Sequence, residues 1–357
     1  MIMNKDPFIG FACAYTPLAL VHAAGFTPCR ILPAGDCPDQ AGHLLHDNLC
    51  PHVKRILDRA LSRQIPDLTG MIFMNSCDAM RRLYDAWQVA RPDIPCILVD
   101  LPTTVSERNI AFFFGELQRL AGVLEKWGGT RLDPEKLAAS LQLFARLAGQ
   151  FEKIRARVQA GDLRNGATML QAAYLKASVT APEPMIGELE TLLSQESAGQ
   201  ADDGVPVYLF GNVLPETEAF ALFAECGARI VGEDLCTGSR LFTEIRVDDD
   251  SPDSLPDGLL KNYAKGLLNR QPCARTMIGT RPGELAADII RAARLSGAKG
   301  VIGHTVKFCD PYIARIPNIR AALKQEGIPF LMLEGDCTVR SIGQQKTRIE
   351  AFIEMLR

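Results

Sequence analysis

Residues 71–75, Met71-Ile72-Phe73-Met74-Asn75, form a short apolar run that ends at the helix-start sequence Ser76-Cys77-Asp78. A short apolar run bounded by turn residues is typical of a strand that is buried on both faces. A helical pattern over 78–90 and a second apolar run at 96–100 follow it directly. A strand, a helix and another strand in this order predict a βαβ unit with parallel strands.

The same alternation of short apolar runs and helical patterns continues on both sides of this unit. Toward the N-terminus it predicts strands at 8–13 and 29–33 and helices at 17–24 and 51–63. Toward the C-terminus it predicts strands at 207–210, 229–231, 301–303 and 330–333, helices at 284–295 and 313–325, and a closing helix around 349–356. We therefore expect two α/β domains, at residues 1–105 and 205–357.

Residues 106–195, between the two domains, have a different pattern. Apolar side chains recur at helical spacing along two faces, namely Phe113, Leu117, Leu120, Val123 and Trp127, and then Leu141, Phe144, Leu147, Phe151 and Ile154. This predicts a segment of several long helices, followed by a polar linker at 194–204. The expected fold class is α/β, with two parallel-sheet domains bridged by a helical segment.

Composition excludes several classes of partner. The 357 residues carry a net charge of −3, which gives no electrostatic reason to expect binding to nucleic acid or to an anionic membrane. No stretch approaches 18 uninterrupted apolar residues, so we expect no transmembrane helix. The N-terminal residues lack a long apolar core, so we expect no signal peptide and a cytoplasmic protein.

The chain contains eleven cysteines, an odd number with no C-x₂-C pair. Disulfides are disfavoured in a reducing compartment, which leaves buried thiols and a metal site assembled from distant positions. Cys50, Cys77 and Cys309 each stand where a helix should begin. Free backbone N–H groups at a helix start stabilise a thiolate, which suits a sulfur that binds metal or stays ionised. The pattern suggests an iron–sulfur site in the cleft between the domains, at the carboxyl ends of the strands.

The other cysteines fall into two groups. Cys29, Cys37, Cys96, Cys226 and Cys337 are interpreted as buried structural thiols. Cys13, Cys236 and Cys273 lie at the ends of predicted elements and are candidate ligands as well as candidate structural thiols. The interval from Cys13 to Cys50 equals that from Cys236 to Cys273, which either an ancient duplication or chance would produce.

Few other motifs carry chemistry. No Walker A sequence occurs, so the chain should not hydrolyse ATP itself. His304 is a candidate hydrogen-bond donor to a cluster sulfur or a structural histidine. Arg240 is a candidate for binding an anionic substrate group or an ordinary surface charge. No catalytic acid, base or nucleophile can be argued from spacing.

Seven stretches together resemble a known family. They are 13–17 (Cys-Ala-Tyr-Thr-Pro), 23–28 (Ala-Ala-Gly-Phe-Thr-Pro), 50–51 (Cys-Pro), 77–78 (Cys-Asp), 233–240 (Glu-Asp-Leu-Cys-Thr-Gly-Ser-Arg), 308–310 (Phe-Cys-Asp) and 343–352 (Gly-Gln-Gln-Lys-Thr-Arg-Ile-Glu-Ala-Phe). As a set they resemble the 2-hydroxyacyl-CoA dehydratase D-component family, which includes benzoyl-CoA reductase subunits and double-cubane cluster proteins. The resemblance spans nearly the whole chain and implies two Rossmann-like domains.

The resemblance also implies a cofactor and partners. It implies a [4Fe–4S] cluster held by Cys50, Cys77 and Cys309, with one iron left open. A separate ATP-hydrolysing iron–sulfur activator supplies low-potential electrons in this family. The chain would pair with itself or with a related subunit. The expected chemistry is radical dehydration of a 2-hydroxyacyl-CoA, a lyase reaction, or ATP-dependent reduction of a CoA thioester.

Two alternatives stay open. Cys13, Cys236 and Cys273 match the additional cysteines of the double-cubane branch, which implies as the first alternative an [8Fe–9S] cluster and reduction of small molecules without CoA. The other alternative is a non-catalytic protein of the same fold that binds a ligand or partner between its domains.

Overall fold

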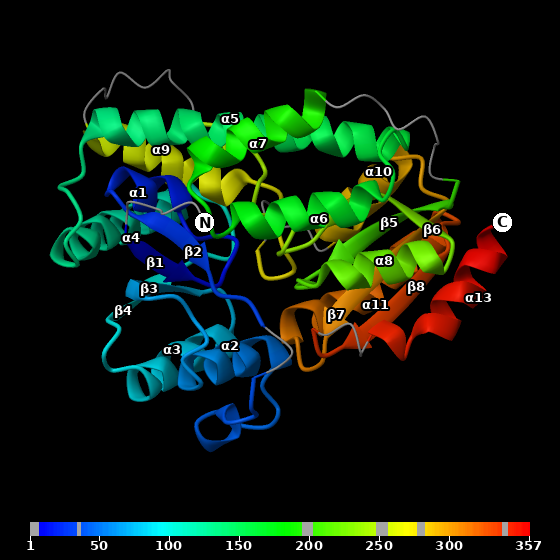
Figure 1. Ribbon diagram of the computed structural model, residues 1–357, viewed down its shortest axis with the longest axis horizontal. Helices are drawn as coiled ribbons and strands as arrows, with labels where there is room; N and C mark the ends of the chain where they lie inside the picture. The colour runs from blue at the N-terminus through cyan, green and yellow to red at the C-terminus, as the bar shows by residue number, and fades with distance from the viewer. Residues whose placement is uncertain (1–6, 34–36, 195–202, 248–255, 277–282, 338–341) are drawn as a thin grey trace.

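A computed structural model describes residues 7–33, 37–194, 203–247, 256–276, 283–337 and 342–357. Most of the predicted linker at 194–204 lies outside these residues. Within the described ranges, no helix is long and apolar enough to cross a membrane. Two four-stranded sheets and a set of long helices make up the molecule (Figure 1).

The N-terminal sheet is entirely parallel, with the strand order β2-β1-β3-β4. Its strands are β1 (Phe8–Phe11), β2 (Thr27–Arg30), β3 (Leu68–Asn75) and β4 (Cys96–Asp100), and its helices are α1 (Leu18–Ala23), α2 (Pro51–Leu61) and α3 (Asp78–Ala90). The apolar run in β3 is fully buried because helices cover both faces of the sheet. The predicted βαβ unit is confirmed.

The C-terminal sheet repeats this topology, with the order β6-β5-β7-β8 and all strands parallel. Its strands are β5 (Val205–Gly211), β6 (Ala228–Asp234), β7 (Gly300–Val306) and β8 (Phe330–Gly335). Helices α8 (Thr217–Glu225) and α13 (Lys346–Leu356) cover one face, and α10 (Glu284–Leu295) and α11 (Asp310–Gln325) cover the other. In both sheets the strand order reverses beside the first strand, and such a switch point opens a crevice at the carboxyl ends of the strands.

Four helices join the two sheets, namely α4 (Glu107–Lys126), α5 (Pro134–Ala160), α6 (Gly166–Ala177) and α7 (Pro182–Ser194). Helix α5 packs against α1 at one end and β6 at the other, so it runs across both domains (Figure 1). Its twenty-seven residues begin after Asp133, whose carboxylate caps the helix, and end at Gly161 in the left-handed conformation. The predicted helical bridge is therefore present.

One helix of the C-terminal half of the sequence packs against the N-terminal domain. Helix α9 (Pro256–Asn269) lies on α4, and its residues Leu260, Tyr263 and Leu267 share a core with Ile9 of β1. The chain therefore crosses between the two domains again after β6. This crossing places Cys273, which follows α9, between the two sheets.

Gly211 is the last residue of β5. Because it has no side chain, the backbones of β5 and β7 approach each other more closely there than any other residue would permit. It pairs with His304 of β7, and a Cβ atom there would overlap the His304 carbonyl oxygen. We expect Gly211→Ala to lower the free energy of unfolding by about 3 kcal/mol, because the two strands must separate. Chemical denaturation would measure this loss. Gly122→Ala in α4 is the control: open space surrounds Gly122 and alanine is the better helix former, so that variant should lose no stability. An equal absence of loss in Gly211→Ala would contradict the prediction.

Candidate functional site

Six cysteines from both domains line one cavity of about 110 Å³. They are Cys13, Cys50, Cys77, Cys236, Cys273 and Cys309. Five of them follow strands or begin helices at the edge where the carboxyl ends of the two sheets face each other, and Cys273 follows α9. The structure thus brings together every cysteine that the sequence nominated as a ligand.

Cys50, Cys77 and Cys309 are the N-cap residues of α2, α3 and α11. Their predicted positions at helix starts are confirmed. Cys77 and Cys309 are topologically equivalent, because each caps the helix that follows the third strand of its sheet. Phe308, directly before Cys309, has a left-handed backbone with φ 59°, a conformation that is uncommon for a non-glycine residue and turns the chain into α11.

Cys13, Cys236 and Cys273 lie in loops rather than at helix starts. Cys13 follows β1, Cys236 follows β6, and Cys273 lies beyond the end of α9. Cys13 and Cys236 therefore follow different strands of their sheets, the first and the second, so their equal intervals to Cys50 and Cys273 do not mark equivalent positions. Within the topology, the residue that corresponds to Cys13 lies near Asn212, which also lines the cavity.

The six thiols form two neighbouring groups. Cys77 lies close enough to Cys50 and Cys309 for their negative charges to raise its pKa. The negative charges of Cys236 and Cys273 likewise raise the pKa of Cys13. The two groups also influence each other, because Cys13 raises the pKa of Cys77 and Cys236 raises that of Cys309.

Burial decides the ionisation of these thiols. It raises the pKa of Cys13 and Cys50 to about 11 and that of Cys77 to about 12. Backbone N–H groups in the first helical turn, such as that of Met80 beside Cys77, lower the pKa by a smaller amount. Without a bound metal, the loss of water outweighs the helix terminus, so of the two roles that a helix start suits, metal binding and an ionised free thiol, burial favours metal binding. Metal binding would have to displace their protons.

Arginine side chains surround the cavity at its Cys236 end. Arg240 is fully buried, and its Nη1 donates a hydrogen bond to the Cys236 sulfur at 3.0 Å and to the Gly211 carbonyl at 3.2 Å. Its Nη2 forms an ion pair with Asp234 at 2.7 Å. Arg30, also buried, donates to the Cys236 carbonyl oxygen. Arg240 is thus not the ordinary surface charge that was one of its two interpretations: it is a buried cation beside a thiol.

The donor set fits an iron–sulfur group better than a hard metal ion. Among the described residues that line the cavity, six are cysteines and none is Asp or Glu. Soft thiolates select iron–sulfur clusters, zinc or copper(I), whereas carboxylates select magnesium and calcium. In the described part of the chain, no three His, Cys, Asp or Glu side chains close around a single metal ion. A cluster is larger than one ion, so thiols spread over the walls of a cavity suit it.

Other residues of this cavity carried no signal in the sequence. Tyr312, buried in α11, donates to the Gly211 carbonyl oxygen at 2.5 Å and accepts a hydrogen bond from Arg240 at 3.0 Å. Asn212 binds Thr305 at 3.1 Å and joins the ends of β5 and β7. Only the fold brings these neutral or buried side chains together, and no spacing rule could have found them.

The five cysteines interpreted as structural do not line the cavity. Cys29, Cys37, Cys226 and Cys337 are buried, and Cys96 is half-buried in β4. Cys337 lies near the site: burial raises its pKa well above the ordinary value, and the charges of Cys50 and Cys309 raise it further.

His304 is not placed to act on the cavity. Both ring nitrogens are buried without a partner, and burial lowers the pKa of His304 to about 4. The unfolded chain therefore binds more protons than the folded one between pH 4 and about 6.5, so stability falls as the pH drops through this window. We expect a loss of about 2 kcal/mol between pH 7.5 and pH 5 from His304.

Denaturant titrations at both pH values would measure this change, with His304→Gln as the comparison. Burial lowers the pKa of His52 to about 3. His52 therefore also lowers the stability of the fold as the pH drops, and it does so in both proteins. An equal pH dependence in the two proteins would contradict the assignment to His304.

Comparisons with known proteins show the family of this chain. The sequence profile of the family "2-hydroxyglutaryl-CoA dehydratase, D-component" matches residues 13–356. The chain is 26% identical to lactoyl-CoA dehydratase subunit beta of Anaerotignum propionicum, over 98% of this chain and 91% of that protein. It is 22% identical to the (R)-phenyllactyl-CoA dehydratase beta subunit of Clostridium sporogenes, with 98% and 91% covered. It is 21% identical to one of the benzoyl-CoA reductase subunits of Thauera aromatica, with 90% and 84% covered.

The chain therefore belongs to the 2-hydroxyglutaryl-CoA dehydratase D-component family, and it is homologous to dehydratase and reductase subunits. The family match covers three of the four strands of the N-terminal sheet, the whole C-terminal sheet, the helical bridge and all six cavity cysteines. The resemblance drawn from the sequence motifs is confirmed. The relatives act on different acyl groups, so the family does not specify a substrate for this chain.

Proposed function

We propose that this chain is the iron–sulfur component of a 2-hydroxyacyl-CoA dehydratase or of a CoA-thioester reductase. The observation that carries the proposal is the meeting of Cys50, Cys77 and Cys309, three helix-capping thiols from two domains, on one cavity without carboxylates among its described lining residues. These three residues would hold a [4Fe–4S] cluster. Bound there, the cluster supplies one-electron transfer at low potential to the acyl group.

The surrounding residues would set the conditions for that chemistry. The buried apolar walls, which include Val53, Met80 and Val306, exclude water and lower the local dielectric. Backbone N–H groups at the helix starts would offset the negative charge of the Cys50, Cys77 and Cys309 thiolates, and the guanidinium groups of Arg240 and Arg30 would offset that of Cys236. Because burial raises the pKa of the thiols, cluster loading releases their protons and is favoured by higher pH.

A second candidate function is a double-cubane reductase, and a specific observation favours it. Cys13, Cys236 and Cys273 form their own group beside the first three cysteines and line the same cavity. Six thiols would suit two cubanes that share a bridging sulfide. The Arg240 hydrogen bond to the Cys236 sulfur is compatible with a ligated sulfur and with a free thiol, so it does not decide between them.

We expect Cys236→Ser to lower the iron content of the anaerobically purified protein by up to half under the double-cubane hypothesis. Iron analysis, with circular dichroism to check the fold, measures the effect. An unchanged iron content would remove that hypothesis and leave the three-cysteine site untouched. If Cys236 is only a buried thiol, the free energy of unfolding should fall by about 1 kcal/mol.

The partners follow from the same proposal. The relatives are named as subunits, so we infer that this chain pairs with a related subunit or with a second copy of itself. A separate ATP-hydrolysing iron–sulfur activator would deliver the electron. A non-catalytic protein that binds a ligand or partner between its domains is the remaining candidate, and it requires no iron.

Anaerobic reconstitution tests the function. The purified chain, a related subunit and an activator would be mixed with ATP and a panel of 2-hydroxyacyl-CoA thioesters, and enoyl-CoA would be followed by mass spectrometry. Product formation that depends on ATP and on Cys77 supports the dehydratase. ATP-dependent reduction of an aromatic or enoyl thioester supports the reductase. Conversion that persists in iron-free protein would contradict both.

A further inference from the structure

A pocket lies between the helical bridge and β6, the edge strand of the C-terminal sheet. Its volume is about 280 Å³, and its walls are mainly apolar. Leu170, Phe220 and Ile230 line it, and none of them is more than 4% exposed. An apolar cavity of about 150 Å³ is large enough to bind benzene. The pocket therefore has room for a ring that carries a substituent.

Tyr208 of β5 is a buried polar side chain of this pocket. It is 5% exposed, and its hydroxyl has no hydrogen-bond partner among the described residues. Its ring lies against Gly232 of β6, where a Cβ atom would stand 3.0 Å from the ring. Unlike the side-chain atoms that are buried without a partner, this hydroxyl is accessible to solvent. Buried tyrosine hydroxyls normally have a partner, so this one is available to a ligand.

The charged groups that line the pocket already have partners within the protein. Arg155 forms an ion pair with Glu152 and donates a hydrogen bond to the Tyr174 hydroxyl at 3.1 Å. The carboxylate of Glu233 accepts hydrogen bonds at 2.9 Å and 2.7 Å from two backbone N–H groups of the turn that carries Cys236. A charged ligand would therefore have to displace interactions that the protein makes with itself.

Electrostatics at Tyr208 also oppose an anionic ligand. Burial raises the pKa of Tyr208 well above its ordinary value, and the charges of Asp234 and Glu233 raise it further. An acid beside the hydroxyl would meet the same two negative charges. A ligand amine would lose its hydration among the apolar walls. The surroundings of Tyr208 therefore favour a neutral ligand.

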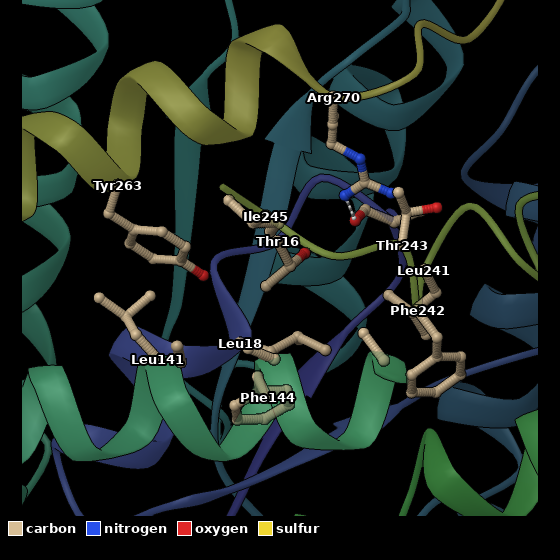
Figure 2. A pocket seen from close by; sticks show the side chains of 14 residues that line it. Thr16, Leu18, Leu141, Phe144, Leu241, Phe242, Thr243, Ile245, Tyr263 and Arg270 are labelled. Atoms are coloured by element: carbon tan, nitrogen blue, oxygen red, sulfur yellow. Dashed lines mark hydrogen bonds between the residues drawn. The ribbon is translucent and has the colours of Figure 1, made fainter. Parts of the chain in front are cut away.

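The pocket can be reached from solvent, and it is separate from the cysteine cavity. Glu152 and Gln159, two of the residues that line it, have exposed side chains. The described residues that line it include none that line the cysteine cavity. The pocket in Figure 2, which Tyr263 and Arg270 line, has a volume of about 40 Å³ and is too small for a ring.

We propose that the pocket between the helical bridge and β6 binds a small neutral aromatic molecule that carries a hydroxyl group. The ring would lie among the apolar walls, where Tyr174 and Phe220 offer aromatic contacts, and the hydroxyl would bond to that of Tyr208. The inference goes beyond the proposed function and does not depend on a cluster being present.

Fluorine NMR titration of the anaerobically purified full chain tests the proposal. The probe para-fluorophenol should bind more tightly than para-fluorotoluene, in which a methyl group replaces the hydroxyl. Tyr208→Phe should weaken binding of para-fluorophenol about fivefold, the loss expected for one neutral hydrogen bond, and should leave the affinity for para-fluorotoluene unchanged. Tyr263→Phe is the matched control, because Tyr263 is also buried but lines the small pocket of Figure 2.

Two charged probes test the class of ligand. Both para-fluorobenzoate and para-fluorobenzylamine should bind more weakly than para-fluorophenol. No binding of para-fluorophenol, unchanged affinity in Tyr208→Phe, an equal loss in Tyr263→Phe, or tighter binding of the acid or the amine would overturn the proposal. Should Tyr208→Phe fail to fold, the comparison of the four probes in the unmodified protein still decides. Iron content is not a readout here, so failure of this inference and failure of the proposed function are distinguishable.

Discussion

We expect Cys309→Ser to abolish iron binding in the anaerobically purified protein while the fold is retained. Cys309 caps α11 and is the only member of the first cysteine group that comes from the C-terminal domain. Its loss would leave Cys50 and Cys77, both from the N-terminal domain, as the ligands of that group. A cubane that already has one open iron would then lose a second protein ligand.

Iron and acid-labile sulfide analysis would measure this effect, together with loss of the brown absorbance. The matched control is Cys96→Ser in β4, a half-buried thiol outside the cavity, which should keep its iron. If Cys309→Ser retained the iron content of the unmodified protein, Cys309 would not be a ligand and the three-cysteine site would be wrong.

We also expect Arg240→Ala to lower the free energy of unfolding by about 3–5 kcal/mol. The substitution leaves Asp234 as an unpaired buried charge and removes donors from Gly211 and Tyr312. Because Arg240 joins the ends of β5 and β6 to α11, the wall of the cavity would loosen as well. Chemical denaturation of the cluster-free protein isolates the effect on the fold.

The comparison protein is Arg291→Ala, whose exposed pair with Asp288 should contribute less than about 1 kcal/mol. The double variant Asp234→Ala/Arg240→Ala should lose less than the two single variants together, because it leaves no buried charge unpaired. A loss in Arg240→Ala as small as that in Arg291→Ala would show that the buried pair does not stabilise the domain.

The sequence predicted the regular elements best where a short apolar run meets a clear helix start. The bounds of α3, β4 and α10 agree with the predicted ranges 78–90, 96–100 and 284–295. Prediction was poorer for β2, which is Thr27–Arg30 rather than 29–33, because pairing with β1 decides where the strand begins. The position of α9 on the N-terminal domain could not be predicted, since its apolar face fits either domain equally well.

In the candidate site, too, the sequence predicted the local features and not those that depend on tertiary packing. Helix-start positions marked Cys50, Cys77 and Cys309, because capping is a local property of the chain. The pKa values of these thiols could not be predicted, because they depend on burial, which only the packing of two domains determines. The burial of Arg240 carried no signal for the same reason: a charged residue in a turn is normally exposed.

The central claim is that this cavity holds an iron–sulfur cluster, and the iron and sulfide content of anaerobically purified protein tests it most directly. The three-cysteine site predicts about four irons per chain, with sulfide in equal amount, and the six-cysteine site predicts about eight irons. Protein that is purified and reconstituted without oxygen, is folded, and contains no iron or sulfide would contradict the claim.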